Sequence, residues 1–253
     1  MLFDTHCHLD AEAFDADRGE IVARARRAGV GWQVLPATHA EGWPGLRAAA
    51  GLDAGLFPAY GLHPTFLRHH LPDHLDDLAR WIERERPVAV GECGLDFYLE
   101  DLDRDAQQHY FDGQLELARD HDLPVIVHAR RAVDAVIQSI RRVGRLRGVV
   151  HSYAGSKEQA AQLWDLGFLI GIGGPVTYER ARRMHRVVTE VPLEQLLLET
   201  DAPDQPDSTH RGQRNEPGRI VGVRDAVARL RGMAPDAVAD ATTRNAHALF
   251  GTA

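Results

Sequence analysis

Short apolar runs recur along the chain at regular intervals, and each is bounded by turn residues. Eight of them have the length and the valine, isoleucine and leucine content of strands: 2–3, 30–37, 56–62, 88–91, 124–127, 149–150, 168–172 and 196–198. The stretches between them carry apolar residues three and four positions apart, the spacing of one helix face, as at Leu75, Leu78 and Ile82. Helices are therefore predicted at 17–28, 71–86, 105–121, 133–143, 157–166 and 223–231.

Alternating strands and helices imply parallel strand pairing with right-handed crossovers. Eight such units in 253 residues predict a single closed (β/α)8 TIM barrel, with a doubly wound open sheet as the alternative. No repeat, low-complexity tract or linker is visible, so we expect one domain over 1–253. The longest irregular stretch, 202–218, would be the loop after the last strand, over the mouth of the barrel.

Histidines and carboxylates stand at, or just beyond, the carboxyl ends of five of the eight runs. They are His6, His8, Glu92, His128, His151 and Asp201. The carboxyl ends of barrel strands form the rim where active sites lie, so we expect these six side chains to converge. In an extended strand His6 and His8 also project to the same side, where both imidazoles can bind one metal ion. Taken singly, each residue has another interpretation, such as a surface histidine pair or a helix N-cap at Asp201.

Four imidazoles and two carboxylates are more than one four-coordinate ion needs, so the set predicts two divalent ions. We assign one ion to His6, His8, Glu92 and Asp201, and the other to Glu92, His128 and His151, with Glu92 as the bridge. Mixed nitrogen and oxygen ligands suit Zn, Mn, Co or Ni, and favour Mg less. Asp201 is the candidate catalytic residue, taking a proton from the attacking water.

Two further residues are candidates for substrate binding. His63, before Pro64, and Arg130 stand where an anionic substrate would meet them, since arginine forks onto phosphate. The alternative is a packed loop histidine and a surface arginine. Other residues near the last strand either shape the pocket or brace its loop: Glu199, Arg211, Arg214 and Asn215. Gly171, Gly173 and Gly174 lack the spacing and the lysine of a phosphate-binding loop.

Composition limits the partners. A net charge of −8 argues against broad adhesion to a phosphate backbone but leaves a local basic site open. The basic run Arg141, Arg142, Arg145 and Arg147 is interpreted as a solvated helix end. No membrane span or secretory signal is visible, and Cys7 and Cys93 offer no disulfide framework, so we expect a cytoplasmic protein. Nothing requires a partner chain, and a monomer is expected.

At these residues the chain resembles the TatD family of metal-dependent hydrolases in the amidohydrolase superfamily. The resemblance runs end to end, and its motifs are Asp4-Thr5-His6-Cys7-His8-Leu9-Asp10, Gly61-Leu62-His63-Pro64, Val90-Gly91-Glu92-Cys93-Gly94-Leu95-Asp96, Val127-His128-Ala129-Arg130, Val149-Val150-His151-Ser152-Tyr153-Ala154-Gly155-Ser156 and Leu198-Glu199-Thr200-Asp201-Ala202-Pro203. It implies a metal-dependent deoxyribonuclease on a TIM barrel, acting on DNA or another phosphodiester. It also implies that the six residues above bind the metals and that His63 and Arg130 lie at the pocket and the substrate phosphate.

The chain departs from the family pattern at two motifs. Ser152-Tyr153 replaces the usual Cys-Phe, and Asp204 stands where the family often has an aromatic residue, as in the YjjV-type branch. Hydrolysis of an ester, lactone or amide, in a small molecule or an aminoacyl-tRNA, is therefore the alternative activity, and a non-enzymatic metal-binding scaffold is a third. Lys157 is the sole lysine, which excludes the subtypes whose metals are bridged by a carboxylated lysine of the fourth strand.

Overall fold

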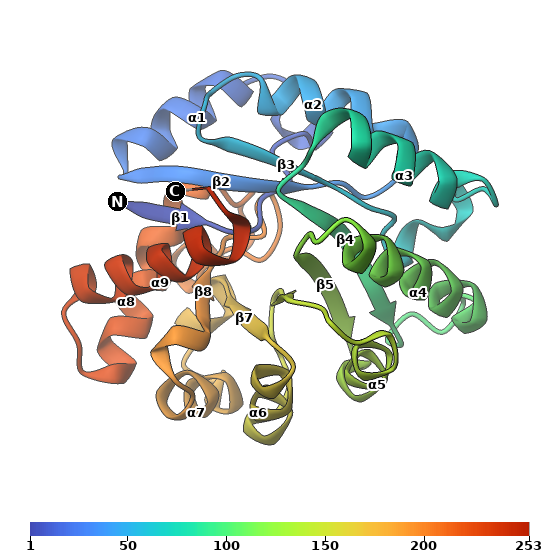
Figure 1. Cartoon of the computed structure of the whole chain (residues 1–253). Coiled ribbons are helices and arrows are strands. Elements are labelled where there is room, and N and C mark those ends of the chain that lie inside the picture. Colours follow the sequence, from blue (N-terminus) through green and yellow to red (C-terminus); the bar gives the residue numbers. More distant parts are fainter. Residues whose placement is uncertain (253) are drawn as a thin grey trace.

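A computed structural model describes residues 1–252 and shows a barrel of eight parallel strands that pair in the order of the chain (Figure 1). The strands are β1 (Leu2–Asp4), β2 (Val30–Pro36), β3 (Leu56–Tyr60), β4 (Ala89–Asp96), β5 (Val125–Arg130), β6 (Gly148–Val150), β7 (Phe168–Ile172) and β8 (Leu196–Leu198). The barrel closes just beyond β1 and β8, where the Thr5 N–H donates to the Leu198 carbonyl at 3.0 Å. The predicted TIM barrel is confirmed, and the open sheet is excluded.

Nine α-helices lie among the described residues, mostly between successive strands. They are α1 (Arg18–Arg27), α2 (Trp43–Ala50), α3 (His74–Glu85), α4 (Arg104–Asp120), α5 (Val133–Val143), α6 (Lys157–Asp165), α7 (Arg182–Glu190), α8 (Ile220–Arg231) and α9 (Pro235–Phe250). The six predicted helices are present, with ends that differ by at most three residues. None of the helices in residues 1–252 has both the length and the apolarity to span a membrane.

The sequence reasoning missed α2, α7 and α9. Helix α7 buries only Val187 and Val188, and alanine or threonine supplies four of the seven buried side chains of α9. A helix with few large apolar side chains is stabilised mainly by tertiary packing, which a search for apolar residues at helical spacing does not detect.

Helix α9 closes the amino-terminal end of the barrel. Its residues Leu249 and Phe250 pack against Phe3 of β1 and against inward-facing residues of other strands, including Val34 and Leu197. Figure 1 shows α9 lying beside β1 and β8. With this end filled by apolar side chains, polar side chains gather at the opposite end, where the strands finish.

Candidate metal centre

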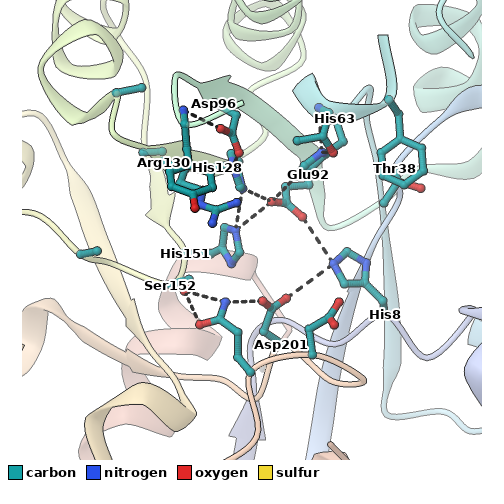
Figure 2. Close-up of a pocket in the computed structure, with 18 of the residues that line it drawn as sticks. His8, Thr38, His63, Glu92, Asp96, His128, Arg130, His151, Ser152 and Asp201 are labelled. Atoms are coloured by element: carbon teal, nitrogen blue, oxygen red, sulfur yellow. Dashed lines mark hydrogen bonds and ion pairs between the residues drawn. The ribbon is translucent and has the colours of Figure 1, made fainter. Parts of the chain in front are cut away.

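Glu92 lies at the centre of the polar cluster, and imidazoles surround its carboxylate (Figure 2). The imidazole nitrogens within reach are His6 Nε2 at 3.1 Å, His8 Nε2 at 3.5 Å, His63 Nε2 at 3.0 Å, His128 Nδ1 at 3.2 Å and His151 Nε2 at 2.8 Å. Both carboxylate oxygens take part, and the Glu92 side chain is only 1% exposed. A central carboxylate with nitrogens on both oxygens has the arrangement of a bridging ligand.

Glu92 reaches this position from the middle of its strand. The apolar run at 88–91 predicted that Glu92 follows the end of a strand. This prediction was wrong, because β4 continues to Asp96. Val90 pairs with Val125 and Cys93 with Val127, so three residues of β4 advance against two of β5. Such a bulge bends a strand and redirects a side chain. His128 also lies inside its strand, β5, whereas His151 directly follows β6.

The other ligand candidates come from segments beyond β1 and β8, which are bonded to each other. The Asp201 N–H donates to the His6 carbonyl at 2.9 Å. The carboxylate of Asp4 accepts from the Thr200 hydroxyl at 2.6 Å and from the Thr200 N–H at 2.9 Å, and burial raises its pKa to about 8. These bonds connect residues nearly 200 positions apart and hold His6 beside Asp201.

His6, His8 and Asp201 complete one side of the cluster. The two Nε2 atoms of His6 and His8 are 3.2 Å apart, and Asp201 Oδ1 lies 3.5 Å and 3.6 Å from them. The intervening Cys7 is buried, with its thiol 3.7 Å from the Ala202 carbonyl. Burial raises the pKa of Asp201 to about 6, although His151 and His8 oppose the shift.

The residues present fit divalent cations. Ligand atoms about 2.1 Å from one ion lie about 3.0–3.4 Å from each other, close to the 2.8–3.6 Å separations found here. Within residues 1–252, Glu92 Oε2 is buried and accepts no hydrogen bond, although burying a carboxylate oxygen without a hydrogen-bond donor is costly. Ligand atoms of His6, His8 and Glu92 form one group within 4.8 Å of one another.

His63 is arranged to donate to Glu92. Its Nδ1 accepts from the Thr65 N–H at 3.2 Å, so the neutral ring carries its proton on Nε2, which faces Glu92 at 3.0 Å. Burial lowers the pKa of His63 to about 4, and the ring therefore stays neutral. His63 thus orients the Glu92 carboxylate from the wall of the pocket.

Asp96 is a residue of the site that sequence reasoning missed. Its Oδ2 lies 3.0 Å from His128 Nε2, and its Oδ1 accepts from the Tyr98 and Leu99 N–H groups at 2.9 Å and 3.2 Å. The Nε2–H of His128 therefore donates to Asp96, and Nδ1 turns its lone pair toward Glu92. Asp96 is the last residue of the motif 90–96, which also contains Glu92, and this position was the signal in the sequence that could have identified it.

Glu199 is a buried carboxylate beside His151. It is fully buried, its Oε1 accepts from the Ser152 N–H at 2.5 Å, and the same oxygen lies 3.7 Å from His151 Nδ1. A Cβ atom at Gly171 would lie only 2.1 Å from Glu199 Oε2. The glycine at 171 therefore makes room for a buried carboxylate, which explains one member of the glycine-rich run.

A cavity of about 1610 Å³ opens above the cluster. Arg130, Arg131 and Arg183 line it, and the Arg130 guanidinium stacks 3.7 Å from the ring centroid of Tyr98.

The remaining candidates from the last loop lie outside this cavity. Arg214 pairs with Asp17 at 2.7 Å, Asn215 Nδ2 donates to the Thr200 and Asp204 carbonyls at 2.9 Å, and Arg211 lines a different cavity. The only lysine, Lys157, pairs with Glu190 on the surface at 2.7 Å.

Comparisons with known proteins identify the family of this chain. The model of the family described as TatD related DNase matches residues 3–251. The uncharacterized metal-dependent hydrolase YjjV of Escherichia coli K12 is 42% identical over 98% of this chain and 96% of its own length. The 3'-5' ssDNA/RNA exonuclease TatD of Pantoea ananatis is 32% identical over 99% of both chains. The crystal structure of Escherichia coli YjjV superposes with a TM-score of 0.95, at 41% identity, over 100% of this chain and 98% of that one. The chain therefore belongs to the TatD family of metal-dependent hydrolases.

Proposed function

We propose that this protein is a divalent-metal-dependent phosphodiesterase that hydrolyses DNA. The observation that carries the proposal is the convergence of four imidazoles and two carboxylates at the base of a cavity whose wall bears arginines. The family description and the exonuclease name of the Pantoea ananatis relative favour a nucleic-acid phosphodiester as the substrate class.

The cluster divides into two ligand sets that share Glu92. His6, His8, Glu92 and Asp201 would hold one ion, and Glu92, His128 and His151 the second. Bound there, divalent ions such as Zn, Mn, Co, Ni or Mg would supply Lewis acidity and an acidified water. The neutral tautomers set by Asp96 at His128 and by Thr65 at His63 keep each ring in its assigned role.

Three side chains have the roles of transferring the proton, binding the phosphate and positioning Glu92. Asp201 takes the proton of the attacking water and returns it to the leaving oxygen, since its Oδ1 lies 3.5 Å and 3.6 Å from the ring nitrogens of His6 and His8, at the edge of the cavity. Arg130, at the cavity wall, forks onto the phosphate. His63 keeps the Glu92 carboxylate in place while the substrate occupies the cavity.

The test is hydrolysis of bis(p-nitrophenyl) phosphate and of short single-stranded DNA by metal-free protein reloaded with Mn, Zn or Mg. We expect metal-dependent turnover of both, with about two ions per chain by elemental analysis. Asp201→Asn should lose far more kcat than affinity, because it removes the proton acceptor. Turnover that persists in Asp201→Asn would contradict the role of Asp201, and two bound ions without turnover of either substrate would refute the phosphodiesterase.

Arg130 provides a second check. Arg130→Ala should mainly raise KM for phosphodiesters, because the phosphate loses its guanidinium contact before and during reaction alike. Arg104→Ala is the matched control, since its guanidinium also lies over an aromatic ring, that of Phe97 at 4.5 Å, but on helix α4. Unchanged phosphodiester kinetics in Arg130→Ala would show that Arg130 does not bind the phosphate.

One observation favours hydrolysis of a carboxylic ester, lactone or amide as the second candidate. Besides the cluster, Asp10, Glu12, Asp134 and Asp204 line the cavity, and this negative charge opposes a polyanionic substrate. Assaying the metal-loaded protein on carboxylic esters and amides beside the phosphodiesters separates the two. Preference for the uncharged substrates, with about two ions bound, would support this candidate.

A further inference from the structure

A second cavity, of about 740 Å³, lies apart from the metal centre, beside α7 and α8. Figure 1 shows these two helices next to each other, and the loops that follow β7 and β8 complete the cavity wall. The residues that give it chemical character are three arginines and three hydroxyl-bearing side chains: Arg180, Arg211, Arg229, Thr177, Tyr178 and Ser208. Glu179 is the one carboxylate among its lining residues.

The arginines of this cavity are available for a ligand. In the part of the chain that the structure describes, Arg180, Arg211 and Arg229 form no ion pair, and each is exposed. Two members of the basic run noted in the sequence differ, since Arg142 pairs with Asp112 and Arg147 with Asp122, both at 2.6 Å. The chain has more acidic than basic residues, yet positive charge remains unbalanced around this cavity.

Arg183 connects the second cavity to the first. It lines the main cavity, and its Nε donates to the Gly155 carbonyl at 3.0 Å, which holds the side chain at the mouth. Arg180, which lines the second cavity, is three residues earlier, so their Cα atoms are at most about 11 Å apart. At about 3.4 Å per nucleotide along a strand, a backbone of at most about three nucleotides spans the distance between these two Cα atoms.

We infer that the second cavity binds the phosphodiester backbone of a single-stranded nucleic acid whose scissile bond lies at the metal centre. The inference rests on the proposed function and adds a distant binding site to it. Arg180 and Arg211 fork onto backbone phosphates, and Ser208 is an additional donor at the same wall. A local cluster of this kind lets a protein with a net charge of −8 hold a polyanion without a basic surface overall.

The test is a comparison of two charge-reversed proteins in EDTA, where no hydrolysis occurs. Arg180→Glu with Arg211→Glu alters the second cavity. Arg141→Glu with Arg244→Glu changes the net charge by the same amount at two exposed arginines of α5 and α9. Fluorescence anisotropy measures the binding of fluorescein-labelled oligothymidylates of two and twenty nucleotides, and thermal unfolding checks that both proteins fold.

We expect the Arg180/Arg211 variant to bind the twenty-mer at least about tenfold more weakly, since two phosphate contacts are lost. Its ratio of twenty-mer to two-mer affinity should fall, because a two-mer has a single internucleotide phosphate, which cannot lie at the metal centre and in the second cavity at once. The slope of log affinity against log salt should decrease by about 1.4, from about 0.7 per phosphate contact on a single strand. Arg180→Gln with Arg211→Gln should show the same effects at smaller size.

Three results would overturn the inference: equal loss of affinity in both charge-reversed proteins, unchanged binding in the Arg180/Arg211 variant, or no binding of the twenty-mer by the unaltered protein at low salt. Failure of the proposed function is a separate result, because it is measured as turnover by the metal-loaded protein. Turnover with unchanged binding in the Arg180/Arg211 variant refutes only the second cavity. Selective loss of binding without phosphodiester turnover refutes only the hydrolytic reaction.

Discussion

Replacing Asp96 by asparagine tests how the second metal position is built. The Asp96 carboxylate accepts from the Nε2–H of His128, which leaves Nδ1 unprotonated and facing Glu92. An asparagine keeps the size of the side chain, and its carbonyl can still accept from the Tyr98 and Leu99 N–H groups. Its amide then presents an N–H to His128 Nε2, so the ring takes the other tautomer, with the proton on Nδ1. A protonated Nδ1 cannot ligate a metal.

The size of the effect follows from this geometry. Loss of a partner that orients a metal-bound histidine typically costs about 10–100-fold in metal affinity, or about 1.4–2.7 kcal/mol. Only the ion held by Glu92, His128 and His151 should be affected, because the ring nitrogens of His6 and His8 make no contact with Asp96. We therefore expect Asp96→Asn to bind one ion as before and the second about 10–100-fold more weakly.

Isothermal titration of the metal-free protein with Zn²⁺ or Mn²⁺ measures both affinities. The matched control is Asp112→Asn, which makes the same chemical change at a carboxylate of α4 that pairs with Arg142 outside the site. Thermal unfolding of both variants checks the fold. If Asp96→Asn bound two ions with unaltered affinities, the tautomer argument would be wrong, and His128 would not depend on Asp96 as a ligand.

Three stability measurements probe other parts of the fold. His70 Nε2 donates to the His63 carbonyl at 3.0 Å, and burial lowers the pKa of His70 to about 4. As the pH falls below 6.5, the unfolded chain therefore binds a proton at His70 that the folded protein does not bind. Urea unfolding should therefore show a loss of about 2 kcal/mol from pH 7 to pH 5 that His70→Gln lacks; an equal loss in that variant would contradict the assignment. Gly171→Ala should destabilise by about 1–3 kcal/mol, because its Cβ meets Glu199, whereas Gly19→Ala, with open space in α1, should be neutral or stabilising. Phe250→Ala should cost about 3–5 kcal/mol in thermal or urea unfolding, and a loss below about 1 kcal/mol would mean that α9 does not seal the barrel.

The barrel and the convergence of its polar residues were predictable from local pattern. The apolar runs occur once per strand and helix pair, so their rhythm indicates the fold without any contact information. A parallel barrel brings all strand ends to one rim, and this is why His151, which follows β6, could be placed beside residues far away in sequence. Glu92 fitted the rule less well, because a bulge inside β4, not the strand end, turns it inward.

The partners of the ligands could not be predicted in the same way. Asp96 and Glu199 act through bonds to residues of other strands or the segments after them, and the distances of 3.0 Å and 2.5 Å that define those bonds depend on side-chain packing. Nothing in the spacing of residues states that Asp96 faces His128 Nε2 while the backbone of Tyr98 satisfies its other oxygen. Such roles depend on the tautomer and the burial of each group, which only the folded chain determines.

Charge is the property for which composition and structure differ most. A net charge of −8 describes the whole surface, but a phosphate responds to the charge within about 8–10 Å of it. Arginines such as Arg142 and Arg147 are neutralised by carboxylates on neighbouring elements, so a run of basic residues in the sequence need not produce a basic site. Arg180 and Arg211 are far apart in sequence but lie around one cavity without an ion pair in residues 1–252. The local field that a substrate strand meets therefore depends on which arginines near it lack an ion pair, and the loops after β7 and β8 bring Arg180 and Arg211 together around this cavity.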